Sequence, residues 1–120
     1  MSNNRKDYNL YLIDIKNCCL KINRYIKNKS YSDFQKDHML SDAIDKNLLI
    51  IGEAANKIPS EIRKKYPDIP WKTTIGMRNK LIHDYFELDI KVIWDTVQKD
   101  IPKLKSQILK LLNKSKKSVD

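Results

Sequence analysis

Apolar residues recur at steps of three and four along most of the chain, which is the spacing of amphipathic helices. In the first such stretch, residues 7–27, they are Tyr8, Tyr11, Leu12, Ile15, Cys18, Cys19, Ile22, Tyr25 and Ile26. This stretch predicts one helix. The polar run "NKSYSD" ends the pattern, and we expect Ser32 or Asp33 to cap the next helix.

The second stretch, residues 34–58, predicts the central helix because it is apolar over a wide arc. Its stripe consists of Leu40, Ile44, Leu48, Ile51, Ala55 and Ile58. Gly52 and Ala54 are small, which would let another helix cross closely. Glu53 lies between them, and we interpret it as a carboxylate at the surface or at an interface rather than as a catalytic group.

Shorter segments follow this central helix. Ser60 can open a helix of only a turn or two, because Pro67 and Pro70 stop it. A further helix is predicted over residues 71–82. The last segment starts near Asp89, and its apolar residues then repeat at close to 3.5 residues.

Pro102 interrupts this last segment. It lacks a backbone donor, so we expect a kink or a break over residues 99–101. The whole pattern predicts an all-α bundle of four main helices plus a short one. We place this helical domain at residues 1–113, followed by a basic tail over residues 114–120 that frays.

Composition agrees with a helical fold, and the charge limits the classes of binding partner. Two glycines and four prolines are too few for the many turns of an all-β protein. Lys and Arg number 24 and Asp and Glu 15, so the formal charge is 24 − 15 = +9. This charge suits a polyanionic partner such as RNA, DNA or an acidic protein surface. The alternative is an ordinary soluble protein with a basic tail.

The two cysteines, Cys18 and Cys19, are adjacent, so they do not favour a disulfide and have no zinc-site spacing. They indicate a reducing compartment. No apolar run approaches the roughly 20 residues of a membrane span, and the N-terminus is polar. We therefore expect a cytoplasmic protein without a membrane segment, a metal site or a cofactor.

The candidate chemistry lies in "GMRNKLIHDYFELD", which brings Arg78, Asn79, His83 and Tyr85 into eight positions. On a continuous helix Arg78 and His83 point about 140° apart, whereas Asn79 and His83 share a face. Two routes could bring Arg78 to His83. The arginine side chain could swing around the helix, or the helix could end near His83.

These side chains suit phosphate chemistry without a metal. Histidine exchanges protons near neutral pH, and arginine binds phosphate oxygens. RNA fits well because its own 2′-hydroxyl can attack the adjacent phosphorus once a base takes its proton. The alternative is that His83 is structural, as a lone histidine beside an apolar run usually is.

The stretch "MRNKLIHDY" resembles the R-x-x-x-x-H-x-Y motif of the HepT toxins, within the wider HEPN superfamily. "IGEAANKIP" resembles the central-helix stretch of that family. "YPDIPWKTTIGMRNKLIHDYFELDIKVIWDTVQKDIPKLKSQI" is similar to the family over its whole length. The resemblance covers residues 8–112.

The resemblance implies a HEPN-type bundle that dimerises about a twofold axis, with a cleft shared between subunits. It implies a metal-independent endoribonuclease in which Arg78 is the phosphate-binding cation, His83 the general acid or base and Asn79 a supporting polar residue. Tyr85 would be the tyrosine to which a small nucleotidyltransferase antitoxin adds AMP. The chain would then be the toxin of a type VII toxin–antitoxin pair.

Two other readings compete with this one. The chain could be a non-catalytic HEPN module that docks a nucleotidyltransferase or a nucleotide. It could also be a structural helical dimer in which His83 is a helix-end residue. The presence of Arg78, Asn79 and His83 together favours the enzyme, because a scaffold does not need all three.

Overall fold

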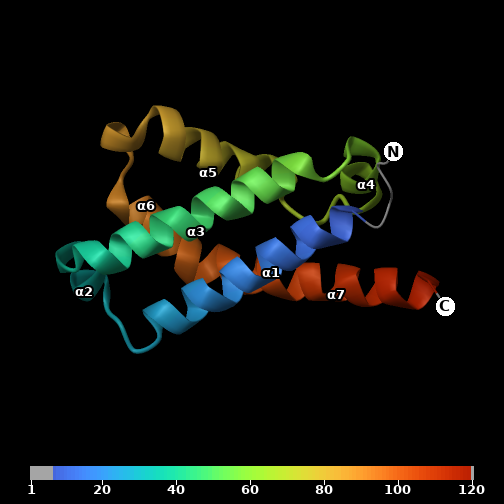
Figure 1. The fold of residues 1–120 in the computed structure, drawn as a ribbon. Coiled ribbons are helices and arrows are strands. Elements are labelled where there is room, and N and C mark those ends of the chain that lie inside the picture. Colours follow the sequence, from blue (N-terminus) through green and yellow to red (C-terminus); the bar gives the residue numbers. More distant parts are fainter. Residues whose placement is uncertain (1–6, 120) are drawn as a thin grey trace.

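The computed structural model describes the backbone of residues 7–119 and the side chains of residues 8–114. Over that range the fold is all-α, as predicted (Figure 1). The helices are α1 (Asp7–Ile26), α2 (Tyr31–Lys36), α3 (His38–Lys57), α4 (Ser60–Lys65), α5 (Trp71–His83), α6 (Ile90–Asp95) and α7 (Ile101–Val119). A 3₁₀ turn, η1 (Tyr85–Glu87), and a π-helical turn, η2 (Thr96–Asp100), complete the chain.

Helix α3 occupies the middle of the bundle. It packs against α1 on one side and against α5 on the other, and α1 also packs against α7. In Figure 1, α5 runs along α3 on the face that is turned away from α1 and α7. The four main helices of the prediction are thus α1, α3, α5 and α7, and α4 is the predicted short one.

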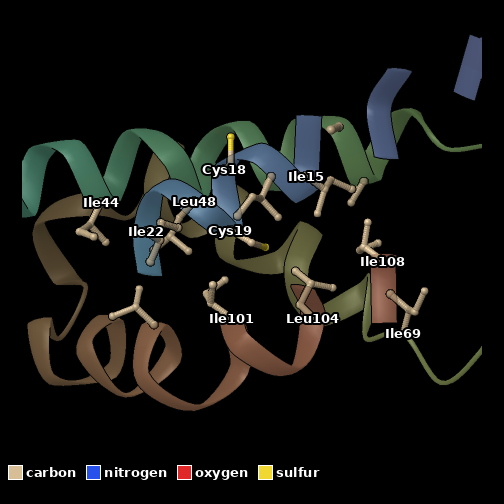
Figure 2. Packing of buried hydrophobic residues seen from close by; sticks show 14 of the residues in the cluster. Ile15, Cys18, Cys19, Ile22, Ile44, Leu48, Ile69, Ile101, Leu104 and Ile108 are labelled. Carbon is tan, nitrogen blue, oxygen red and sulfur yellow. The ribbon is translucent and has the colours of Figure 1, made fainter. Parts of the chain in front are cut away.

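The core lies between α1, α3 and α7, where apolar side chains point toward one another (Figure 2). Fully buried examples are Ile15 and Ile22 of α1, Ile44 of α3 and Ile108 of α7. Both cysteines belong to this core as free thiols. Burial raises the pKa of Cys19 to about 12, so its thiol stays protonated.

The predicted start of the second helix at Phe34 was wrong, because the chain forms two helices there. Ser30 caps α2 through a capping box with Asp33, and Asp37 caps α3 by accepting from the Leu40 N–H at 3.1 Å. Each cap offers the backbone a local partner that ends or begins a helix. The break lets Phe34 turn inward, where its ring lies 5.2 Å from that of Trp94.

The disruption expected near Pro102 is present as η2. The N–H of Ile101 donates to the carbonyl of Thr96, five residues earlier, instead of following the α-helical pattern. Proline offers no N–H to continue the normal ladder, and the wider turn accommodates this. The interruption separates α6 from α7.

Gly52 allows α5 to approach α3 closely. A Cβ atom placed on Gly52 would overlap the Cβ of Arg78 and would lie 3.1 Å from the carbonyl oxygen of Thr74. The prediction that small residues permit a close crossing is therefore confirmed at Gly52. Trp71 fixes the start of α5, because its indole N–H donates to the Tyr66 carbonyl at 3.0 Å.

In the described part of the chain, no helix is both long and apolar enough to cross a membrane. The fraying of the tail over residues 114–120 stays a prediction, and most of the polar N-terminus lies outside the described residues. The structure does not describe residues 1–6 and 120, nor the side chains of Asp7 and residues 115–119.

Candidate active site

Arg78 lies on the face of α5 that contacts α3. Its Nε–H donates to Oε1 of Glu53 at 2.7 Å, and its Nη2 forms an ion pair with the same oxygen. Its Nη1 donates to Oδ1 of Asn79 at 2.8 Å. The interpretation of Glu53 as an interface carboxylate is confirmed, because it joins α3 to α5.

These contacts orient the guanidinium but do not use all of its N–H donors. An arginine has five N–H groups, and the three contacts leave further N–H groups on Nη1 and Nη2. The Arg78 side chain is 25% exposed, so part of it remains accessible to solvent. A planar cation held in this way can bind phosphate oxygens at little loss of side-chain freedom.

His83 is the last residue of α5, and its side chain is exposed. The last α-helical bond runs from the Asp84 N–H to the Lys80 carbonyl at 2.8 Å, and the chain then turns into η1. Of the two routes considered, the helix does end at His83, whereas the arginine turns to Glu53. No hydrogen bond joins Arg78 to His83 among the described residues.

Asn79 is exposed on α5, four residues before His83, so the two belong to the same face of the helix. Because Asn79 also accepts from Arg78, it links the arginine to the face that carries the histidine. A ligand lying along this face could contact Asn79 and His83, and Asn79 connects them to the Arg78 guanidinium.

Tyr85 lies in η1 and is 45% exposed. Its hydroxyl donates to Oδ2 of Asp45 at 3.3 Å, and its ring meets that of Phe86 edge-on at 5.7 Å. Asp45 is eight residues before Glu53 on α3, which corresponds to about 12 Å along the helix. Tyr85 and Arg78 therefore attach the α5–η1 segment to α3 at two separate points.

Asp45 has a perturbed carboxyl group. Burial raises its pKa to about 6, the hydrogen bond from Tyr85 opposes this, and the charge of Asp42 adds to it. Its second oxygen, Oδ1, is buried without a hydrogen-bond partner among the described residues. The charge of Asp45 in turn raises the pKa of the Tyr85 phenol. A cavity of about 260 Å³ between α2, α3, η1 and α6 is lined by both side chains.

The sequence pointed to Arg78, Asn79, His83 and Tyr85 but not to Asp45. Asp45 follows Ile44 of the buried stripe and has no motif around it. Among the described residues, no three His, Cys, Asp or Glu side chains lie close enough together to hold a metal ion.

Comparisons with known proteins identify relatives along nearly the whole chain. The model of a family described as "Ribonuclease HepT-like" matches residues 15–111. A protein of Caldanaerobacter subterraneus subsp. tengcongensis named "Putative RNase TTE0752" is 42% identical over 106 residues, which are 88% of this chain and 95% of that protein.

Two further relatives are similar to the chain to about the same degree. "Probable ribonuclease HepT" of Thermococcus cleftensis is 40% identical over 111 residues, 92% of this chain and 98% of that protein. "Putative RNase MJ1216" of Methanocaldococcus jannaschii is 39% identical over 108 residues, 90% of this chain and 89% of that protein. Among solved structures, none matches the chain at a significant level.

Proposed function

Because the chain belongs to the HepT-like ribonuclease family, we propose that it is a metal-independent endoribonuclease in which Arg78 binds phosphate and His83 transfers a proton. The main structural support for this proposal is the set of contacts that the Arg78 side chain makes. Its guanidinium is fixed by Glu53 and Asn79 yet keeps donors free, and Asn79 shares a helix face with the exposed His83.

The reaction uses the substrate's own nucleophile. The RNA 2′-hydroxyl attacks the adjacent phosphorus, its proton passes to a base, and the 5′-oxygen leaves with a proton, giving a cyclic phosphate and a 5′-hydroxyl. His83 acts as the general base or the general acid. Arg78 stabilises the charge that develops on the phosphorane oxygens, and Asn79 keeps the guanidinium in place.

Two copies of the chain form the working site in this proposal. Arg78 and His83 are not bonded to each other within one chain, and a C2 homodimer would let both pairs face one groove. Helix α5 is suited to that position, because it packs on α3 while Asn79, Lys80, Ile82 and His83 remain exposed. The groove would then take an RNA strand, in keeping with the charge of +9.

Tyr85 is the control point of the proposal. A nucleotidyltransferase antitoxin adds AMP to its phenol, which is accessible on η1. The modification brings a phosphodiester anion that competes for arginine and a nucleotide that competes for the space of the RNA. The chain is then the toxin of a type VII toxin–antitoxin pair.

The two histidines of the chain provide the test. Purified wild type, His83→Ala and His38→Ala are incubated with labelled RNA in excess chelator, and the product ends are analysed. His38 is exposed at the start of α3, so its variant should cleave like wild type. His83→Ala should lose nearly all activity, roughly 100-fold or more, because no neighbouring group replaces its proton transfer.

Equal cleavage by all three proteins would refute the role of His83. Activity that disappears in chelator and returns with a divalent ion would refute metal independence. RNA that is bound by the wild type but never cut would favour the non-catalytic binding module instead.

A further inference from the structure

Exposed lysines form a line along one face of α7. Lys103, Lys110 and Lys114 follow one another at intervals of seven and four residues, and all three side chains are exposed. Such intervals return to nearly the same face of an α-helix, so the three lysines cover about 16 Å of the helix axis. Residues 101–119, which form α7, contain no aspartate or glutamate. The line of cations therefore has no opposite charge on its own helix.

The end of α4 adds a fourth lysine to this line. The Nζ of Lys65 lies 5.9 Å from the centre of the Tyr66 ring, and the Nζ of Lys114 lies 5.7 Å from the same centre. An aromatic ring attracts ammonium groups, so Tyr66 holds together two cations that are far apart in the sequence. We call Lys65, Lys103, Lys110 and Lys114 the lysine row.

The charge of the lysine row is largely uncompensated. Among the residues that the structure describes, none of its four members forms an ion pair. Asp68 is the acidic neighbour, because its carbonyl accepts from the Gln107 amide of α7 at 2.7 Å and its side chain is exposed. Exposed cations that lack a counter-charge attract anions from solution, and a single aspartate offsets only part of the row.

The linear arrangement decides the class of partner. A single-stranded nucleic acid carries one charge per nucleotide, and proteins bind it through cations that follow its backbone. Lysine is a compact point charge that binds a phosphate without reading the base beside it. A line of lysines along one helix therefore matches a chain of phosphates.

We propose that the lysine row is a second RNA contact, separate from Arg78 and His83, which holds the strand to one side of the bond that is cut. That RNA is the ligand rests on the proposed function. The row begins beside α5, because Lys103 and Met77 line one cavity of about 280 Å³, and Met77 directly precedes Arg78. A strand can run from α5 along α7 toward Tyr66. The row adds affinity for long strands and takes no part in proton transfer.

The experiment measures binding of a single strand of 2′-O-methyl RNA, which cannot be cut, by fluorescence anisotropy in chelator at several salt concentrations. The test variant, Lys110→Gln/Lys114→Gln, removes two charges of the lysine row. The control variant, Lys29→Gln/Lys36→Gln, removes two exposed charges beside and in α2, at the opposite end of the molecule from α4 (Figure 1). Asp68→Asn removes the carboxylate beside the row. Circular dichroism checks that each variant is folded.

We expect the test variant to bind the strand roughly tenfold more weakly than wild type near physiological salt, because two phosphate contacts are lost. The slope of log affinity against log salt should become shallower by about 1.4, at about 0.7 for each contact with a single strand. The control variant should keep the wild-type affinity and slope, and Asp68→Asn should bind more tightly. In cleavage assays the loss should appear in the KM for long RNA and should be smaller for a dinucleotide, which cannot span from Arg78 to the row.

Equal losses of affinity in the test and control variants would overturn the proposal, since net charge alone would then explain binding. Poly-glutamate that binds as tightly as the RNA would overturn it in favour of an acidic protein partner. A test variant that loses a dimeric mass seen for wild type would overturn it in favour of a second copy of the chain. A wild type that binds the strand through the row but cuts no RNA would support the row and count against the proposed function.

Discussion

At the scale of single residues, Glu53 and Asp45 of α3 bind the two ends of the α5–η1 segment. Glu53 binds the Arg78 guanidinium, and Asp45 accepts from the Tyr85 hydroxyl. Both acceptors are on α3 and both partners are on the α5–η1 segment, so α3 sets the positions of the arginine and the tyrosine. Among the residues that the structure describes, His83 has no such hydrogen-bond anchor, and its position follows from the end of α5.

Asp45 should make the stability of the protein depend on pH. Its pKa is about 6 in the folded chain and 3.8 in the unfolded chain, so the folded state binds the proton more tightly between these values. Its contribution is therefore fully present below about pH 4 and is lost as the pH rises through about 6.

The variant Asp45→Asn cannot titrate and should lack this dependence. Relative to wild type it should gain about 1 kcal/mol in unfolding free energy between about pH 4 and pH 7, a figure reduced for solvent screening because Asp45 is only partly buried. Denaturant unfolding at both pH values measures this. Asp14→Asn, exposed on α1, should retain the wild-type slope. Identical slopes for wild type and Asp45→Asn would mean that this carboxyl is not perturbed.

Residue types predicted the motif but not the contacts of its members. Arginine and histidine suited phosphate chemistry by their types, whereas the role of the tyrosine followed only from the resemblance to the HepT family. The Tyr85–Asp45 contact joins residues 40 apart, and it depends on how η1 turns after His83. Apolar periodicity records only which face of α3 is buried, so it could not indicate that Asp45 meets a tyrosine.

At the element scale, the antiparallel contact between α3 and α5 determines where the candidate site can form. Helix boundaries were predictable where a proline or a cap stands alone, as at Pro102. They were less so where two caps follow closely, because Ser30 and Asp37 each begin a helix and the apolar pattern passes through both. The close crossing at Gly52 was foreseen from residue size, whereas its partner Arg78 was not.

The two glycines of the chain give a matched pair of variants at this scale. Gly52→Ala puts a methyl group where the Cβ of Arg78 lies, so it should destabilise the fold by about 1–3 kcal/mol and lower ribonuclease activity by displacing the arginine. Gly76→Ala meets nothing within 4 Å and should stabilise α5 by about 0.5–1 kcal/mol. Thermal unfolding and RNA cleavage measure both. Variants that behave alike would show that α5 does not approach α3 in this way.

The charge of the whole molecule is unevenly distributed along the chain. The net charge is +9, whereas the segment 84–89 carries three carboxylates and no lysine or arginine. The excess of cations therefore lies elsewhere in the sequence, and it suits the RNA substrate of the proposed function.

Assembly is the prediction that belongs to this scale. We expect a C2 homodimer, so light scattering should give twice the chain mass of 14.2 kDa at micromolar concentration. Mass is the appropriate measurement because the protomer is elongated, with extents of 48 × 30 × 23 Å, and an elution volume would mislead. A stable mass of one chain would contradict the shared groove.

The buried thiols of α1 have a practical consequence for following motion in this protein. Cys19 is inaccessible and stays protonated, and alkylating reagents react with exposed thiolates. Such a reagent can reach Cys19 only when α1 separates from α3 and α7. The rate at which the reagent labels the unaltered chain therefore measures how often its core opens, and no additional cysteine has to be introduced.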